Sequence, residues 1–250
     1  AKDGWTYEVN DKKYNIDKND FSLEIQGEKI KFDCAFIIIH GTPGEDGMLQ
    51  GYFEMLNIPY TTCDVVTSSL TFNKFFTKSY LRNFGVLTPN AMLLKKGNPV
   101  DVNKIINTTG LPCFIKPNQG GSSFGVTKVT KKEQVKSAVL EALKEDDEVI
   151  IESFIKGTEV TCGLIKTKDE DYVLPLTEIV SKKEFFDYEA KYTDGMADEI
   201  VPARISKTLT QKCQDLSSDI YDYLNCSGLV RIDFILDENE FYFLEVNTVP

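Results

Sequence analysis

The chain has 250 residues, a net charge of −11 at pH 7 and 42% hydrophobic residues, so it can bury a core divided among two or three lobes. This charge would repel a phosphate polymer, and no cluster of Lys and Arg offers a local exception, so nucleic acid is excluded as an expected partner. The longest apolar run is far shorter than the roughly 20 residues that span a bilayer, and no signal peptide is recognisable, so no membrane association is expected. The six cysteines form no C-x-x-C pair, which favours reduced thiols and a cytoplasmic location.

The amino-terminal part predicts a lobe of strands, a loop and a helix. Polar and apolar residues alternate over the first thirty or so positions, as in half-buried strands joined by turns such as Asn10-Asp11. Residues 34–39 form a continuous apolar run, which predicts a buried parallel strand that delivers His40-Gly41 to the carboxyl edge of a sheet. Apolar residues at helical spacing over 48–56 predict a helix that ends before Pro59.

Farther along the chain, predicted strands and helices alternate. A helix is expected over residues 131–147, between strands at 111–116 and 148–152, and another amphipathic helix over 209–224. This alternation predicts mixed α and β layers. The predicted domains are residues 1–73, 74–161 and 162–250.

Two strand-like segments, 229–236 and 241–247, flank a polar connection and predict a β-hairpin. If the turn centres on Asn239, Asp233 lies directly opposite Glu245 on one face of the hairpin. Two opposed carboxylates repel each other, and burying them without compensation costs several kcal/mol. A divalent cation would remove this conflict.

The same register places Arg231 opposite Asn247, so that four polar side chains share one face with the carboxylates. Carboxylate oxygens and an Asn carbonyl oxygen are hard ligands that suit Mg²⁺, which keeps water or substrate phosphates in its other positions. This set indicates phosphoryl transfer. The alternative is a solvent-facing polar stripe on an antiparallel hairpin, and a register slip of one residue would break the pairing.

A loop rich in glycine and serine, residues 116–125, follows a predicted strand. Its glycines let backbone N–H groups approach a phosphate, and Lys116 can supply the compensating positive charge. The loop matches neither the Walker A pattern nor the Rossmann fingerprint. The tip of a mobile hairpin is the alternative interpretation.

Other candidate residues lie at strand ends. Glu152 ends one predicted strand and Glu159 begins the next, so both can point into one cleft, although isolated surface glutamates are the alternative. His40 is the only histidine, which excludes a zinc site built from histidines and a Ser-His-Asp triad elsewhere. A lone histidine is often structural, but the stretch 41–47 that follows is rich in glycine and acid and favours an active-site loop.

Five segments resemble the successive motifs of D-alanine:D-alanine ligases, in the order of that family and over nearly the whole chain from Phe32. They are HGTPGEDGMLQGYFEMLNIPYTT, KPNQGGSSFGV, ESFIKGTEVTCG, FFDYEAKY and RIDF with FLEVNTVP. The resemblance implies an α/β protein with the ATP-grasp fold, in which two α+β lobes clamp ATP between their sheets. A partial amino-terminal pre-ATP-grasp lobe would help to hold the amino acids. It also implies a homodimer.

The resemblance implies specific roles for residues around the nucleotide. The phosphate-contacting group comprises Lys74, Lys116 and the loop residues Gly121, Ser122 and Ser123. The segment beside adenine comprises Glu152, Ser153, Phe154 and Ile155, with Glu159 at the ribose. The ligands of two Mg²⁺ ions, for which Mn²⁺ can substitute, are Asp233, Glu245 and Asn247.

Further roles are implied around the amino acids. Arg231 would stabilise the charged intermediate, while His40 and Glu45 would lie near the first D-alanine. The expected mobile loop over the site contains Tyr188, Lys191 and Tyr192. With Tyr192 at this position, the sequence resembles ligases that select D-alanine rather than D-lactate as second substrate.

The implied reaction uses ATP to make D-alanyl phosphate, which the amine of a second D-alanine attacks to give D-alanyl-D-alanine, a precursor of peptidoglycan. Closure of the loop would exclude water from the intermediate. One competing interpretation is another ATP-grasp ligase, such as D-alanine:D-lactate ligase, which Tyr192 argues against. Another is a nucleotide-binding module without catalysis, which has no need of Arg231 beside two metal carboxylates.

The sequence departs from the family pattern at both ends and in the mobile loop. The Gly-Gly-x-Ser-x-Glu segment that precedes this region in the family, and the Gly-Met-Thr segment with its serine that follows, are not found here. We therefore expect a longer parent protein to be the ligase, and this stretch alone to bind nucleotide without turnover. The amino-acid sequence of residues 192–196 also differs from the commonest one in the family.

Overall fold

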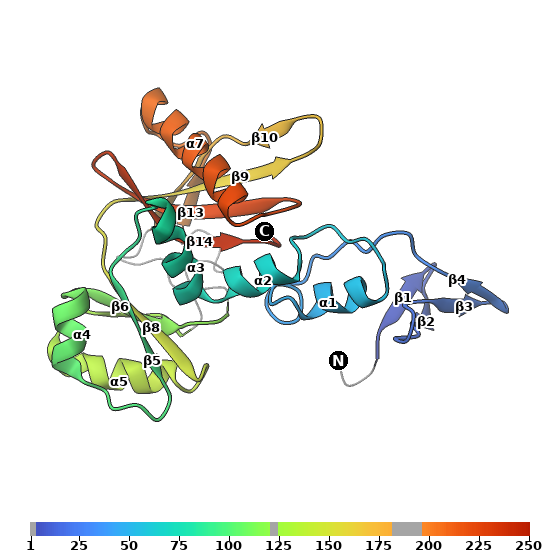
Figure 1. Ribbon diagram of the computed structural model, residues 1–250, viewed down its shortest axis with the longest axis horizontal. Coiled ribbons are helices and arrows are strands. Elements are labelled where there is room, and N and C mark those ends of the chain that lie inside the picture. The colour runs from blue at the N-terminus through green and yellow to red at the C-terminus, as the bar shows by residue number, and fades with distance from the viewer. Residues whose placement is uncertain (1–3, 121–124, 182–196) are drawn as a thin grey trace.

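Two β-sheets and an amino-terminal arm make up the architecture (Figure 1). The computed structural model describes residues 4–120, 125–181 and 197–250. One sheet has four strands in the order β5-β8-β6-β7, and the other has the order β12-β11-β9-β13-β14 with β10 paired to β9. All pairings of the two sheets are antiparallel.

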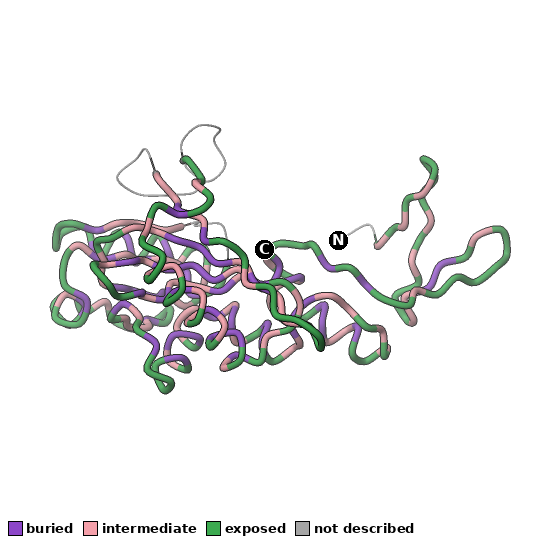
Figure 2. Tube along the Cα trace, turned by 90° about the horizontal axis from the view of Figure 1, so that it is seen from above, coloured by how far each residue is buried: buried purple, intermediate pink, exposed green. Residues whose placement is uncertain are grey.

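The amino-terminal arm consists of two hairpins, which confirms the strands predicted there. They are β1 (Thr6–Val9) with β2 (Lys12–Asn15), and β3 (Leu23–Ile25) with β4 (Glu28–Ile30). Asn10 and Asp11 form the first turn with φ of 49° and 60°, a conformation that asparagine and aspartate tolerate. Figure 2 shows the arm extending away from the sheets. Trp5 and Phe21 anchor it, and the Trp5 ring lies 5.1 Å from the Tyr52 ring.

The predicted buried strand over residues 34–39 is wrong. This segment makes only one isolated parallel bridge, at Ala35. Ala35 and Ile37 are buried, whereas Phe36 is 75% exposed and Ile38 67% exposed. A continuous apolar run predicts burial on both faces, but the described residues cover only one face of this segment, so burial alternates along it.

Three short helices follow the arm and end at the edge of the first sheet. They are α1 (Met48–Met55), which confirms the helix predicted there, α2 (Val65–Phe72) and α3 (Lys74–Leu81), with a 3₁₀ turn η1 (Arg82–Phe84). The Asp64 carboxylate accepts the Thr67 N–H at 2.8 Å, and the Asn73 side chain accepts the Phe76 N–H at 3.0 Å. These caps satisfy exposed amides of the first turns. Because Asn73 ends α2 and caps α3, Lys74 is the first residue of a helix.

Two helices cover one face of the four-stranded sheet. Its elements are β5 (Ala91–Lys95), α4 (Val102–Thr109), β6 (Cys113–Pro117), β7 (Thr127–Val129), α5 (Lys132–Ala142) and β8 (Glu148–Ser153). Helices α4 and α5 bury their apolar faces against the sheet (Figure 1). Helix α5 ends at Ala142 rather than near Asp147, because Lys144 to Asp147 offer no apolar side chain to bury. The opposite face carries Lys116 and Glu152, and Lys78 of α3 contacts Glu152 there.

The second sheet contains the longest strands. Its elements are β9 (Thr158–Lys166), β10 (Asp171–Val173), β11 (Thr177–Ser181), β12 (Ala197–Ile200), α7 (Lys207–Tyr223), β13 (Val230–Asp237) and β14 (Glu240–Asn247). Helix α7 confirms the predicted amphipathic helix and buries Cys213 and Ile220 completely. The predicted domain limits at residues 73 and 161 remain predictions.

The carboxyl-terminal hairpin has the predicted register at its polar end. Asp233 lies opposite Glu245, and Arg231 lies opposite Asn247. Strand β9 pairs with the other edge of β13 and brings Thr161 opposite Asp233. The polar side chains therefore lie on a shared face at the middle of the sheet.

The predicted turn of this hairpin is wrong, and a second irregularity compensates for the error. Asp237 pairs with Glu240, so the turn has two residues and does not centre on Asn239. Such a turn alone would place Leu244 opposite Asp233. A β-bulge after Asp233 shifts the register by one residue and passes over Leu244. The expected carboxylate pair is therefore formed by a two-residue turn and a bulge together.

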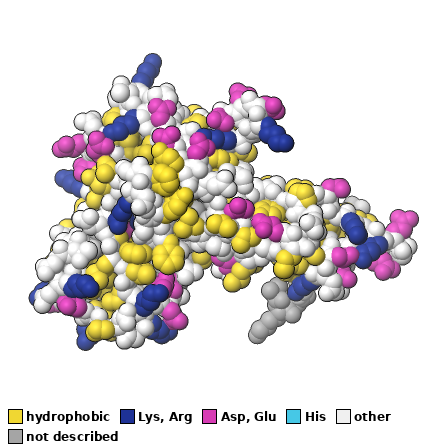
Figure 3. Space-filling view, viewed as in Figure 1, with side chains coloured by type: hydrophobic (Ala, Val, Ile, Leu, Met, Phe, Trp, Pro, Cys, Tyr) yellow, Lys and Arg dark blue, Asp and Glu magenta, His cyan; other side chains and the backbone are white. Residues whose placement is uncertain are grey.

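Charged side chains of both signs are interspersed over the surface seen in Figure 3, and apolar side chains gather between the two sheet lobes. Within the described ranges, no helix has both the length and the apolar character needed to cross a bilayer. All six cysteines are free thiols, and four of them are buried.

Candidate active site

A pocket of about 660 Å³ lies between the two sheets, a size typical of sites for small molecules. Its two parts differ in chemistry. The apolar part includes Phe114, Val126, Phe154, Ile155, Ile179 and Ile235. The charged part includes Lys74, Lys116, Glu152, Glu159, Asp233 and Glu245. The pocket therefore suits a ligand with a flat apolar group at one end and a charged group at the other.

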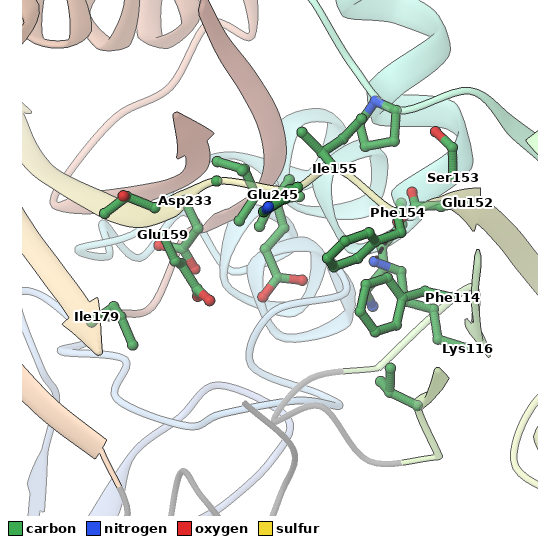
Figure 4. A pocket seen from close by; sticks show the side chains of 18 of the residues that line it. Phe114, Lys116, Glu152, Ser153, Phe154, Ile155, Glu159, Ile179, Asp233 and Glu245 are labelled. Carbon is green, nitrogen blue, oxygen red and sulfur yellow. Dashed lines mark ion pairs between the residues drawn. The ribbon is translucent and has the colours of Figure 1, made fainter. Parts of the chain in front are cut away.

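The segment after β8 forms the apolar part of the pocket. Ser153 donates its N–H to the Asn90 carbonyl at 2.8 Å, and the Asn90 N–H donates to the Ser153 hydroxyl at 3.0 Å. The rings of Phe114 and Phe154 lie 5.9 Å apart and face the pocket (Figure 4). Strand β9 then begins close to β13: a Cβ on Gly157 would lie 2.1 Å from the Leu236 carbonyl oxygen, so only glycine fits there.

Lys74 occupies its place because two polar side chains fix the start of α3. Asn118 accepts the Phe75 N–H on its side chain at 2.9 Å, and its carbonyl accepts the Lys74 N–H at 3.1 Å. The Lys74 ammonium donates to the Gly120 carbonyl at 2.5 Å. Burial lowers the pKa of Lys74, with Lys116 acting in the same direction and Glu245 against it. The lysine therefore contacts the glycine-rich loop at Gly120.

Glu152 holds two lysines at the charged end of the pocket. Lys116 Nζ lies 2.7 Å from Glu152 Oε2, and Lys78 Nζ lies 2.5 Å from Glu152 Oε1. Burial alone would raise the pKa of Glu152, but Lys116 and then Lys78 lower it to about 2. The Glu152 carboxylate is thus an anion between two cations, although it belongs to the segment expected beside adenine. No sequence motif marks Lys78 as a site residue.

Three carboxylates reach the pocket from adjacent strands of the second sheet. Glu159 of β9, Asp233 of β13 and Glu245 of β14 enter from the same side in Figure 4. Arg231 donates from Nε and Nη2 to the two oxygens of Asp233 at 2.8 and 3.0 Å, and Asn247 Nδ2 donates to Oδ2 at 3.1 Å. Burial opposes the charge of Arg231, but Asp233, Glu245 and Glu159 raise its pKa above the ordinary value.

The donor set on these strands fits a magnesium ion. Asp233 and Glu245 offer carboxylate oxygens side by side, and the contact of Asn247 through Nδ2 leaves its carbonyl oxygen as a third hard donor. No cluster of three or more His, Cys, Asp and Glu side chains in the described part of the chain could hold a metal. An ion here would therefore need oxygens from a ligand or water to complete its shell, as Mg²⁺ commonly does.

A smaller pocket of about 30 Å³ adjoins the first and shares Lys74 and Glu245 with it. Glu45 lines it and accepts the Gly41 N–H, which shapes the loop between the arm and α1. Burial raises the pKa of Glu45, and the Gly41 hydrogen bond partly offsets this. His40, which the structure describes, is exposed. It is not among the residues that line either pocket.

Several expected site residues lie outside the described residues. They are Gly121, Ser122, Ser123, Tyr188, Lys191 and Tyr192.

An ion pair that the sequence did not reveal also lies at the pocket. Arg204 donates from Nε and Nη2 to the Glu178 carboxylate at 2.9 and 2.7 Å, and its N–H donates to Glu178 at 3.0 Å. Both residues line the pocket. Glu178 lies on β11 and Arg204 follows β12, so this pair joins the two strands, and no local sequence pattern marks it.

Family models match both parts of the chain. The model described as D-ala D-ala ligase N-terminus matches residues 2–63, and the model described as D-ala D-ala ligase C-terminus matches residues 81–250. Among curated relatives, the D-alanine–D-alanine ligase of Azobacteroides pseudotrichonymphae is 53% identical over all of this chain and 78% of its own length. That of Phocaeicola vulgatus is 54% identical over 94% of this chain and 72% of its own length.

Solved structures confirm the expected ATP-grasp fold. VanG D-Ala:D-Ser ligase from Enterococcus faecalis matches with a TM-score of 0.85 and 35% identity, over 96% of this chain and 72% of that one. D-alanine–D-alanine ligase from Bacillus anthracis, solved in complex with ATP, matches with a TM-score of 0.73 and 32% identity, over 87% of this chain and 68% of that one. The sequence motifs, the pocket between two sheets and these matches agree: the chain belongs to the D-alanine–D-alanine ligase family.

Proposed function

We propose that this protein uses ATP to join two D-alanine molecules into D-alanyl-D-alanine, a peptidoglycan precursor, through a D-alanyl phosphate. The observation that carries the proposal is the pocket between the sheets, which has aromatic residues at one end and lysines and carboxylates at the other. It occurs in a chain that is about half identical to D-alanine–D-alanine ligases. The cytoplasmic location, expected from the cysteines, and the homodimer, expected from the family, remain predictions.

ATP has the polarity that this pocket would accept. Phe114 and Phe154 offer apolar ring surfaces to the base. Glu159 lies on β9 between the apolar and charged parts, where it can accept hydrogen bonds from ribose hydroxyls. Lys74 and Lys116 supply positive charge to the phosphates at the other end.

The carboxylate end of the pocket would hold the metal and the reacting groups. Mg²⁺ bound by Asp233, Glu245 and Asn247 would neutralise the charge that builds on the phosphate oxygens during transfer. Arg231 orients Asp233 through its two hydrogen bonds. The family resemblance also assigns its guanidinium to stabilising an oxyanion, although Arg231 is not among the residues that line either pocket.

The amino acids would enter beside this end. The smaller pocket contains the carboxylate of Glu45, which suits the ammonium group of the first D-alanine. The carboxylate of that D-alanine would attack the γ-phosphorus of ATP, forming the acyl phosphate and releasing ADP. The amine of the second D-alanine would then attack the acyl carbon, lose a proton and displace phosphate. Lys74 and Arg231 would stabilise the charges that develop in the two steps.

The test is to measure binding and turnover together. Mg-ATP binding is measured by calorimetry, and the full-length protein is then incubated with Mg-ATP and D-alanine while ADP release and product mass are followed. We expect ADP and D-alanyl-D-alanine in equal amounts, with neither formed from L-alanine or without Mg²⁺. Binding of Mg-ATP without any consumption would contradict the catalytic proposal and favour a nucleotide-binding module.

The second substrate is a separate question. One structural neighbour, at 35% identity, is named a D-Ala:D-Ser ligase, and D-lactate is the acceptor in the competing ligase interpretation. D-Serine and D-lactate are therefore included one at a time as second substrates. A mixed dipeptide or an ester that forms faster than D-alanyl-D-alanine would move the assignment to the corresponding ligase.

A further inference from the structure

Lys78 is the largest completely buried side chain among the described residues, and it lies behind the pocket rather than in its lining. Its side chain is 1% exposed. Lysine is almost never buried to this degree unless an anion accompanies it. Its spacing from Lys74 in helix α3 is one turn, so both point towards the same side of the helix. Lys74 reaches the pocket, whereas Lys78 ends on Glu152.

The three side chains Lys78, Glu152 and Lys116 carry a surplus of positive charge. Glu152 contacts Lys78 through Oε1 and Lys116 through Oε2, so two cations face one anion and leave a net charge of +1. Burial lowers the pKa of Lys78 to about 8, with Glu152 opposing this shift, so the ammonium form still predominates at pH 7. Of the three side chains, Lys116 and Glu152 line the pocket.

Without Lys78, Lys116 and Glu152 would form a neutral pair. Apart from this ion pair, neither Lys78 Nζ nor Glu152 Oε1 has a hydrogen-bond partner among the described residues. Both oxygens of Glu152 would then be available to Lys116. The negative charge of Glu152 would cancel the positive potential of Lys116 at the pocket. A polyanionic ligand would meet a weaker positive potential, while an uncharged ligand would meet the same surface.

We propose that Lys78 is a positioning residue for nucleotide phosphates: by neutralising Glu152 from behind, it leaves Lys116 able to bind an anion in the pocket. This inference rests on the proposed function, because it takes the charged end of the pocket as the phosphate site. Lys78 itself does not contact the nucleotide. Its effect depends on ligand charge, which separates it from a residue that only supports the fold.

The test compares the affinities of ADP and adenosine, measured by calorimetry and competition, in the 250-residue chain and its variants. Lys78→Met is expected to weaken ADP binding by about 10- to 100-fold, by analogy with the loss of a partner that orients a metal-binding residue. The affinity of the variant for adenosine should stay within about twofold of the original, because adenosine has no charged group to place at the phosphate end of the pocket. Lys95→Met is the matched control. Lys95 pairs with Glu148, which lies on β8 as Glu152 does, but Lys95 is 60% exposed and lies outside the pocket lining.

A double variant guards against a simple loss of folding. Lys78→Met with Glu152→Gln removes one cation and the anion together, so Lys116 keeps its unpaired charge and ADP affinity should return to within about threefold of the original. Thermal unfolding of each variant is recorded alongside.

Equal losses for ADP and adenosine in Lys78→Met, or no recovery in the double variant, would overturn the inference and leave the proposed function standing. If the unaltered protein failed to bind ADP, the proposed function would fail and the inference with it.

Discussion

Glu152 is the residue whose removal should most directly expose the energetics of the site. Its pKa falls from an ordinary 4.5 to about 2 because Lys116 and Lys78 outweigh the effect of burial. Each pKa unit corresponds to about 1.4 kcal/mol, so the folded state favours the ionised carboxylate by about 3 kcal/mol. Glu152→Gln imitates the neutral form and should lower the free energy of unfolding by about that amount at pH 7.

The pH dependence of this loss has a fixed sign. A carboxylate whose pKa is depressed in the folded state stabilises the protein above the unfolded pKa, and this contribution disappears as pH falls through the folded pKa. The difference between the original protein and Glu152→Gln should therefore be constant above about pH 5 and shrink between pH 4.5 and pH 2. The charge-neutral variant should show no matching loss over that range.

Urea unfolding followed by far-ultraviolet circular dichroism at several pH values measures this difference. Fluorescence is unsuitable because the single tryptophan, Trp5, lies in the amino-terminal arm. Glu141→Gln is the control, since Glu141 pairs with Lys144 at the surface with both side chains 65% exposed, and such pairs contribute about 0–1 kcal/mol. Equal stabilities of the two variants at pH 7, or a deficit in Glu152→Gln that persists unchanged to pH 3, would refute the reasoning.

Three further substitutions test other parts of the site. Arg231→Met should lower kcat of the ligase assay by about 10²- to 10³-fold, because an oxyanion partner is lost; an unchanged kcat would exclude that role. Phe114→Ala should weaken adenosine and ATP about equally, by roughly tenfold, as loss of a stacking surface does, and calorimetry with both ligands would expose any charge-selective effect. Gly157→Ala should destabilise the protein by about 1–3 kcal/mol in urea unfolding, because its Cβ would meet the Leu236 carbonyl; unaltered stability would show that β9 can move away.

The sequence predicts those parts of the fold in which the pattern of apolar and polar side chains follows from the burial of one face. Helix α7 and the carboxyl-terminal hairpin have clear periodicity because one face of each is buried. The strand predicted at residues 34–39 was wrong, since an apolar run does not reveal whether one face or both faces of the segment have neighbours. The correct pairing of Asp233 with Glu245 was predicted from an incorrect turn, because a bulge leaves no local pattern in the sequence.

The candidate site was predictable where residues face the pocket and match a motif. Lys74, Lys116 and Glu159 all line it, although their roles remain proposals. Lys78 could not be predicted because a charged residue in an unrecognised helix is expected to be exposed. Its spacing from Lys74 is the one signal, and it has meaning only once α3 is known to be a helix. The Glu178–Arg204 pair depends on two segments brought together by the sheet, which no local pattern records.

The β-bulge after Asp233 has a consequence for protein engineering. Redesign for stability commonly removes irregularities from a sheet and restores an uninterrupted ladder. In this hairpin, a regular ladder built from the same residues and the same two-residue turn would put Leu244 opposite Asp233 and turn Glu245 to the other face. Such a variant would keep every functional group in its sequence and gain hydrogen bonds, yet it would separate Asp233 from Glu245, the two carboxylates of the proposed metal site. The irregularity should therefore be treated as part of the site in any attempt to stabilise this protein.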